Sequence, residues 1–159
     1  MKIRDIVVKN IMTKGKSGDE MIVGLSAEKG EFISQSGELV LKGSSVQELN
    51  IKSTTGDNYI TNVSNSNMNI TSTSGEVLLK DMTEGKSLFI ETKSGDIGVR
   101  YKGVPASLKL MAKSNSADVI VDLKGLKKDK NTEKIKEGTI GDAKNEVKIL
   151  SKTGVIYID

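Results

Sequence analysis

Acidic side chains follow a hydroxyl residue and a glycine at five points of the sequence. These acids are Asp19, Glu38, Asp57, Glu76 and Asp96. The glycines before them are spaced by 19, 19, 19 and 20 residues, so stacked repeats would bring successive carboxylates to about 5 Å from one another. Like charges so close are unfavourable unless they are offset, and Ca²⁺ favours several carboxylate ligands. We predict a solvated turn edge in which each acid bonds its own backbone, with no metal ion and no cofactor. The alternative is a cation column formed by Glu38, Asp57, Glu76 and Asp96.

Catalytic residues are difficult to place in this composition. The chain has no His and no Cys, so a serine nucleophile would need a lysine base. The acids occupy equivalent positions, whereas glycoside hydrolysis needs two carboxylates in different environments. The tract KGKSGDE contains Gly-Lys-Ser but lacks the earlier glycine of a phosphate-binding loop. We therefore predict that the protein is not an enzyme, and a polysaccharide-acting enzyme is the remaining catalytic alternative.

Two further groups of charged or aromatic residues suggest binding. The tract KKDKNTEKIK carries the lysines Lys127, Lys128, Lys130, Lys134 and Lys136. A lysine-rich loop contacts anionic lipid or an anionic wall polymer when it forms a surface patch, but a solvated loop is the simpler interpretation. Arg100 and Tyr101 suggest a small sugar or anion patch, or a solvent-facing strand end, which we favour.

The elements that would position these residues follow an internal repeat. Its turn anchors are Gly18, Gly37, Gly56, Gly75, Gly95, Asn115 and Gly154, each preceded by Ser or Thr. Apolar pairs flank the anchors at fixed distances, such as Leu88 and Ile90 before Gly95 and Ile97 and Val99 after it. Each unit therefore predicts two short strands joined by a turn. Gly and Asn supply positive φ in the turn, and the hydroxyls can bond nearby backbone or the equivalent hydroxyl one repeat away.

The second half of the chain departs from this pattern. After Asn115 the apolar pair slips by two residues to Val119 and Val121, which indicates a bulge. Gly154 follows 39 residues later, or two periods. The slot between them falls in a charged segment, residues 125–141, that we interpret as a degenerate rung or loop. The chain then ends in VIYID, which we expect to form an exposed terminal rung.

These patterns predict a single all-β domain over residues 1–159. Repeats of about 20 residues bury a continuous core only when they stack, so we predict a solenoid-like stack of two-strand rungs with two packed sheets. An antiparallel β-sandwich built of hairpins is the alternative. The net charge of +3 and the presence of only two arginines do not suggest nucleic-acid binding.

The position of the protein in the cell is left open by the sequence. No apolar run approaches the roughly 20 residues of a membrane helix, and the start MKIRDIVVKN is not typical of a signal peptide. We expect either a cytoplasmic protein or an envelope protein whose export or anchoring segment lies upstream of this sequence.

With these residues in hand, the chain resembles the bacterial toastrack repeat family, whose members are often described as adhesin-like. The phrases TSTSGEVLL and ETKSGDIGV are similar to its repeat, and GTIGDAKNEVKILSKTGVIYI is similar to its C-terminal signature. The resemblance implies an all-β stack in proteins of the cell envelope and its antibiotic-stress response, with no catalytic residues to carry over.

We therefore expect a non-catalytic envelope module that binds or scaffolds. Its partner would be a glycan, an anionic polymer or lipid, or another protein. A self-assembling structural module is the alternative, because the ends of a β-stack present open strand edges that pair with another copy unless they are capped.

Overall fold

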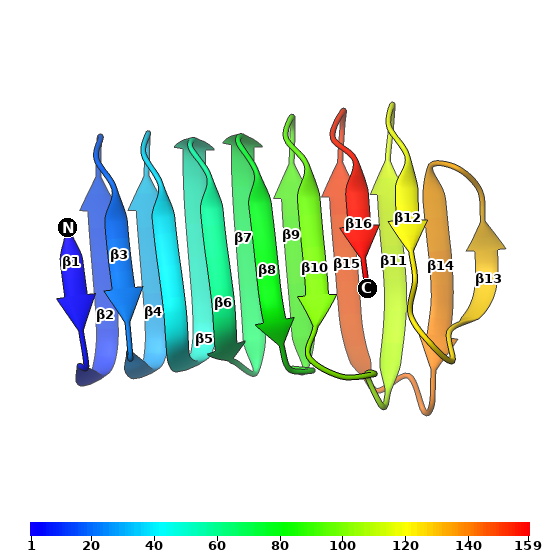
Figure 1. Cartoon of the computed structure of the whole chain (residues 1–159), viewed down its shortest axis with the longest axis horizontal. Coiled ribbons are helices and arrows are strands. Elements are labelled where there is room, and N and C mark those ends of the chain that lie inside the picture. The colour runs from blue at the N-terminus through cyan, green and yellow to red at the C-terminus, as the bar shows by residue number, and fades with distance from the viewer.

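The computed structural model describes residues 1–159 as two facing β-sheets with no helix (Figure 1). The front sheet contains, in spatial order, β1 (Lys2–Arg4), β3 (Glu20–Val23), the first part of β5 (Leu39–Thr55), β6 (Asn58–Ser64), β8 (Val77–Met82), β10 (Ile97–Tyr101), β16 (Ile156–Ile158) and β12 (Val119–Val121). The back sheet contains β2 (Val7–Gly15), β4 (Ser26–Ser34), the rest of β5, β7 (Asn67–Ser74), β9 (Ser87–Thr92), β15 (Asn145–Ser151), β11 (Leu108–Ser114), β14 (Ile135–Ile140) and β13 (Lys127–Asn131).

Neighbouring strands are parallel in both sheets except at one end. The exceptions are the pairs β11–β14 and β13–β14, which are antiparallel. Each rung joins one back strand to one front strand, and the next rung repeats the same register, as in Leu39 opposite Asn58 opposite Val77. The predicted solenoid-like stack is confirmed, and the alternative of an antiparallel sandwich is wrong.

The core lies between the two sheets and follows from the period-2 pattern of each strand. A single cluster of 29 buried apolar residues runs the length of the stack. Ile97 and Val99, for example, lie opposite Val77 and Leu79 of the preceding rung, and all four are almost fully buried. Parallel strands bring equivalent residues together, so a repeated apolar pair becomes a continuous apolar column.

Two columns of tight turns close the rungs. At the first, the predicted anchors Gly18, Gly37, Gly56, Gly75 and Gly95 have positive φ, as expected. The sequence interpretation missed the second, at the opposite corner, where five residues also have positive φ, between 49° and 69°. These residues are Asp5, Gly24, Gly43, Asn62 and Asp81, spaced by 19. All are Gly, Asn or Asp, the residue types that adopt this conformation most readily.

The last rung in the sequence is not the last rung in space. β16 pairs with β10 on one side and β12 on the other, so that Ile156 lies opposite both Ile97 and Val119. Ile156 and Ile158 are fully buried, and Figure 1 shows the C terminus within the stack. The expectation of an exposed terminal VIYID rung is therefore wrong. In this central position Ile156 and Ile158 pack between the apolar pairs of two neighbouring rungs, whereas a terminal rung would have only one such neighbour.

Residues 125–141 form neither a degenerate rung nor an irregular loop. They contain β13 and β14, an antiparallel hairpin in which β14 also pairs with β11. The five residues of β13 are all exposed and read KKDKN. The hairpin thus ends the back sheet with a charged edge strand, a device that opposes pairing with another chain.

The anchor of the β11–β12 rung was assigned two residues too early. Ser114 lies opposite Ser151 and Val119 lies opposite Ile156, so the residue equivalent to Gly154 is Ala117 and not Asn115. Neither Asn115 nor Gly154 has positive φ. The expected bulge before Val119 is therefore wrong, because the apparent slip came from the misplaced anchor.

Candidate functional site

The stacked glycines bring successive turns into backbone contact. A Cβ atom added to Gly37 would lie 2.5 Å from the carbonyl oxygen of Gly18, and Gly56, Gly75 and Gly95 are closer still to the preceding turn. Gly154 stacks on the carbonyl of Gly95 in the same way. Glycine is therefore needed for close approach and for positive φ at Gly37, Gly56, Gly75 and Gly95, and for close approach alone at Gly154.

Hydroxyl side chains connect one turn to the next. The Ser or Thr before the anchor donates to a backbone carbonyl one rung back, as Thr55 does to Gln35 at 3.0 Å and Thr153 to Lys93 at 3.3 Å. The predicted contact between equivalent hydroxyls occurs three residues before the anchor instead. Ser53 donates to Ser72 at 3.0 Å, inside the turn and partly shielded from water.

Aspartates of the acidic column also connect one turn to the next, at the outer side of the turn. Asp19 accepts the backbone N–H of Glu38 at 3.0 Å, and Asp57 accepts that of Glu76 at 2.7 Å. Asp96 accepts the N–H of Val155 at 2.8 Å. These three aspartates thus bond the next rung and not their own backbone as predicted. No group of three or more acidic side chains comes together here, and the cation column at Glu38, Asp57, Glu76 and Asp96 stays an alternative.

Tyr59 is the one aromatic residue that joins this column. Its hydroxyl lies 3.3 Å from Oδ2 of Asp57 and 3.2 Å from Oε2 of Glu76. Burial of the phenol, followed by the charge of Asp57 and the hydrogen bond to Glu76, raises the pKa of Tyr59 to about 12. The phenol therefore stays protonated and shares its proton between two carboxylates of successive rungs.

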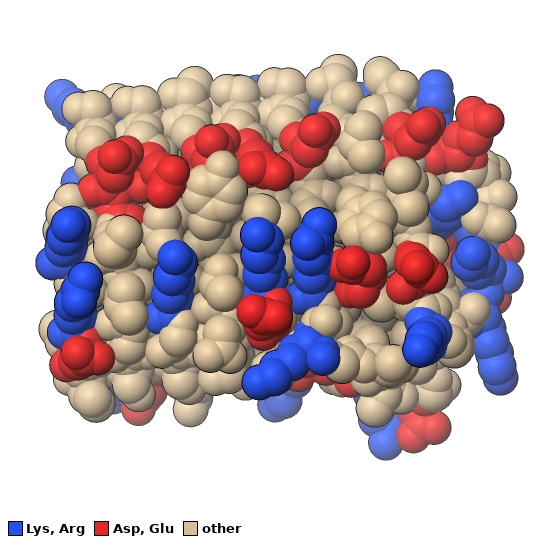
Figure 2. Space-filling view, viewed as in Figure 1, with Lys and Arg blue, Asp and Glu red and all other residues tan.

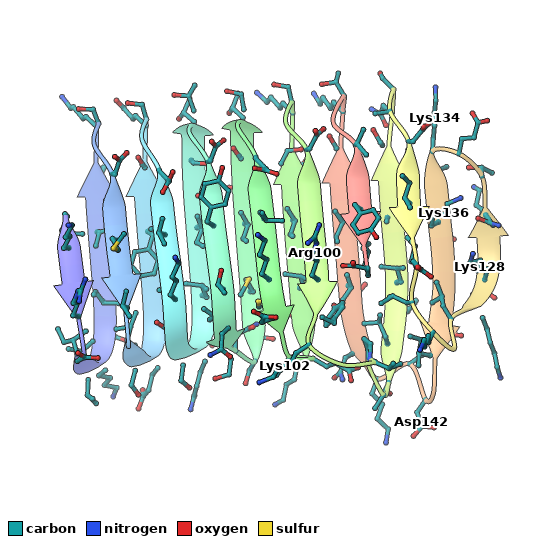
Figure 3. All side chains as sticks on the ribbon, viewed as in Figure 1. Arg100, Lys102, Lys128, Lys134, Lys136 and Asp142 are labelled. Carbon is teal, nitrogen blue, oxygen red and sulfur yellow. The ribbon has the colours of Figure 1, made fainter.

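The lysines of the predicted anionic-surface tract are grouped by the hairpin. Lys127, Lys128, Lys130 and Lys134 are exposed and Lys136 is partly buried. Figure 3 shows Lys128, Lys134 and Lys136 at the hairpin end of the stack. The Nζ of Lys136 donates to Asn131 at 2.7 Å, which leaves the other four as the free cations of this end.

Arg100 and Tyr101 do not form a joint patch, because they point to opposite faces of β10. The guanidinium of Arg100 lies 6.0 Å from the ring centre of Tyr157 and 3.8 Å from Asp159. Tyr101 instead packs against the core, and burial raises its pKa above the ordinary value of 10.0. The expectation of a solvent-facing strand end thus holds for Arg100 alone.

The sequence interpretation missed a depression on the outer face of the back sheet. Its lining includes Asn50, Asn67, Asn69, Ser87 and Phe89. Asn50 lies opposite Asn69, and Asn69 lies opposite Phe89, so amides and one ring form a short row across three rungs. The sequence did contain a signal for this depression, because asparagine and an aromatic residue occupy equivalent outward positions of successive strands.

Glu84 is a second residue that sequence reasoning missed. It lies before β9 and accepts hydrogen bonds from the backbone N–H groups of Ala106 (2.7 Å) and Ser107 (3.0 Å) and from the amide of Asn145 (3.0 Å). Burial alone would raise its pKa, but these hydrogen bonds prevail and lower the pKa below the ordinary 4.5. Glu84 therefore fastens the segment that crosses from β10 to β11 and the start of the intercalated β15.

These features define the molecule as a parallel β-solenoid whose rungs are held together by backbone contact and short polar side chains. The family model described as Toastrack DUF4097 matches residues 1–159. The chain therefore belongs to the toastrack family, as its resemblance indicated. A comparison with curated proteins finds no significant match, and a comparison with solved structures finds none either. The structure has no helix long and apolar enough to cross a membrane.

Proposed function

We propose that this toastrack domain is a non-catalytic cell-envelope module that binds a glycan chain on its back sheet. The observation that carries the proposal is the depression lined by Asn50, Asn69 and Phe89. An amide both donates and accepts hydrogen bonds, which matches neighbouring sugar hydroxyls, and an aromatic ring offers an apolar face for the C–H groups of a sugar ring.

The geometry of the sheet supports an extended ligand over a compact one. Equivalent outward side chains recur about every 4.8 Å along the stack, so a polymer lying across the strands meets a new polar group at each rung. Further depressions at the corner of the sheet are lined mainly by hydroxyl and amide residues, including Ser26, Ser45 and Ser64. A non-catalytic role also fits the acidic column, whose aspartates are engaged with backbone N–H groups.

The experiment that tests this function is a glycan-array screen followed by calorimetric titration of the best oligosaccharide. Phe89→Ala should weaken binding at least about tenfold, because aromatic anchors commonly carry more than 1 kcal/mol of binding free energy. Val104→Ala is the control, since Val104 is an exposed apolar residue that does not line this depression. Equal loss in both variants would contradict the assignment to this depression. Absence of any glycan ligand for the wild type would contradict the function.

A self-assembling structural role is the second candidate, and the exposed apolar residues of β2 favour it. β2 pairs only with β4, so its other edge is free within this chain. Val7 and Met12 on this strand are 82% and 65% exposed. Light-scattering mass across a wide concentration range tests this role, and Val7→Lys with Met12→Lys should abolish any growth through this edge. Growth that persists in this double variant would argue against end-to-end assembly.

A further inference from the structure

The outer face of the front sheet carries three parallel rows of side chains. The acidic row contains Asp19, Glu38, Asp57, Glu76, Asp96 and Asp118. The apolar row contains Met21, Val40, Tyr59, Leu78, Gly98, Tyr157 and Ile120, which are in register across the strands. The basic row contains Arg4, Lys42, Lys80 and Arg100, with the uncharged Val23 and Thr61 between them. Figure 2 shows the red and blue bands separated by an uncharged band along the molecule.

The two charged rows cannot neutralise each other within the chain. Glu38 and Lys42 are four residues apart on one strand, and so are Glu76 and Lys80, which places each acid about 13 Å from its base. The structure contains two ion pairs, Arg100 with Asp159 and Lys144 with Asp142. Neither joins the acidic row to the basic row, so this face keeps two separate bands of opposite charge.

A two-fold axis parallel to the stack brings each band onto its complement. Such a rotation reverses the strand direction and keeps the rung order, so the acidic row of one copy faces the basic row of the other. Glu38 then meets Lys42 of the second copy, Glu76 meets Lys80, and the apolar rows meet in the middle. A two-fold axis along the strands would instead place acid against acid and base against base.

We propose that the front sheet is an interface between two copies of this chain, packed face to face about an axis parallel to the stack. The contact covers the rungs from Gly18 to Gly95. It ends there because the Gly154 rung carries Val155 in the acidic row and Asp159 in the basic row, and the rung beyond it carries Asp118 and Asp122. This interface lies on the sheet opposite the proposed glycan depression and does not depend on it.

The size of the face sets the strength of the contact. The three rows span roughly 30 Å along the stack and about 15 Å across it. That footprint is smaller than the area of about 800 Å² that each partner buries in a standard interface. We therefore expect a weak dimer that forms at high protein concentration and weakens with salt, because exposed ion pairs are screened.

A charge-exchange experiment tests the proposal by sedimentation velocity of the full chain. One variant carries Glu38→Lys with Glu76→Lys, and the other carries Lys42→Glu with Lys80→Glu. Each alone should dimerise at least about tenfold more weakly than the wild type, because its homodimer opposes like charges. An equimolar mixture should restore the dimer, because each exchanged rung then sets two lysines of one copy against two glutamates of the other.

Two controls separate this interface from other causes. Lys52→Glu with Lys148→Glu makes the same charge change on the back sheet and should leave the dimer unchanged. Val7→Lys with Met12→Lys should also leave it unchanged, since end-to-end contacts do not contribute. A wild type that stays monomeric at high concentration would overturn the proposal. So would a mixture of the two charge variants that fails to form a heterodimer.

Discussion

The hydroxyl of Thr92 donates to the hydroxyl of Ser151 at 3.1 Å, although 59 residues separate them in the sequence. This contact exists because the C-terminal rung is inserted beside β9 and β10, ahead of the β11–β12 rung that precedes it in the chain. The last residues of the sequence therefore connect the two halves of the stack. Without this rung, β10 and β12 would both lose β16 as a neighbour in the front sheet. In the back sheet, β9 and β11 would both lose β15.

The intercalated rung predicts that its buried apolar pair controls stability and not assembly. Ile156→Ala should lower the free energy of unfolding by about 2–5 kcal/mol, because it leaves a cavity between two neighbouring rungs. Urea unfolding measures this loss. Val155→Ala, at a partly exposed neighbouring position, should stay within about 0.5 kcal/mol of the wild type. If Ile156→Ala changed the solution mass and left stability intact, the central placement would be contradicted.

The glycine column predicts unequal costs for the same substitution. Gly56 has φ of 124°, and its added Cβ would clash with the carbonyl of Gly37. Gly43 has φ of 54° with open space around the added Cβ. Gly43→Ala should cost about 1 kcal/mol from the left-handed backbone alone, whereas Gly56→Ala must also displace the neighbouring turn and should cost several times more.

Thermal and urea unfolding of both glycine variants check this prediction. Gly18→Ala is the matched control, because Gly18 has φ of 101° with open space around its added Cβ, whereas the φ of Gly43 lies in the left-handed region that other residues can adopt. Equal destabilisation by Gly18→Ala and Gly56→Ala would mean that φ alone explains the need for glycine in the column and that the backbone contact contributes nothing.

The rung period and the buried apolar pairs could be predicted because they are local. Leu88, Ile90, Ile97 and Val99 alternate within single strands, and Gly95 in the turn between them has the expected positive φ. The order of the rungs could not be predicted in this way. Every rung offers the same apolar pair to both neighbours, so the spacing of anchors does not say which rung lies beside which.

The candidate site shows the same division between local and long-range information. The acidic residues after each anchor were visible, but their partner is the N–H of the next rung, as for Asp57 and Glu76, and a single repeat does not contain that contact. The left-handed corner at Gly24, Gly43 and Asn62 was available as a spacing of 19. The repeat at this corner was difficult to recognise because the residue type varies among Gly, Asn and Asp instead of staying the same.

Tyr59 gives a prediction at alkaline pH. Its folded pKa of about 12 is above the ordinary value of 10.0, so its contribution to stability is fully present below pH 10 and is lost as the pH rises through about 12. Phenolate absorbance, compared between the wild type and Tyr59→Phe, isolates its titration. Glu76→Gln should shift that titration toward the ordinary value, because it removes one of the two carboxylates. Titration of Tyr59 at its ordinary value in the wild type would refute the shared proton.

Glu84 gives a prediction at acidic pH. Its folded pKa lies below the ordinary 4.5, so its contribution is present above that value and is lost as the pH falls through the folded pKa. Glu84→Gln should lower the free energy of unfolding at neutral pH by about 1–3 kcal/mol, since it weakens charge-assisted hydrogen bonds to Ala106, Ser107 and Asn145. The difference from the wild type should shrink at acidic pH, as the Glu84 carboxylate of the wild type becomes protonated.

Urea unfolding at both pH values measures the role of Glu84. Glu28→Gln is the control, because Glu28 is exposed and makes no side-chain hydrogen bond. A Glu84→Gln variant whose deficit stays constant with pH would indicate that the carboxylate charge does not fasten the crossing segment.

The hairpin gives a prediction about aggregation. β13 is the outermost strand of the back sheet and pairs only with β14, so its other edge is open to a second chain. Lys128→Val with Lys130→Val removes two charges from this edge and adds β-branched apolar groups. We expect higher-order association, seen as growth in light-scattering mass, because charged edge strands oppose edge-to-edge pairing. Lys52→Val with Lys148→Val makes the same change at paired central strands and should remain at the wild-type mass. If the mass of both variants grew, the cause would be general surface hydrophobicity. If neither grew, the lysines of β13 would not be what prevents edge-to-edge pairing.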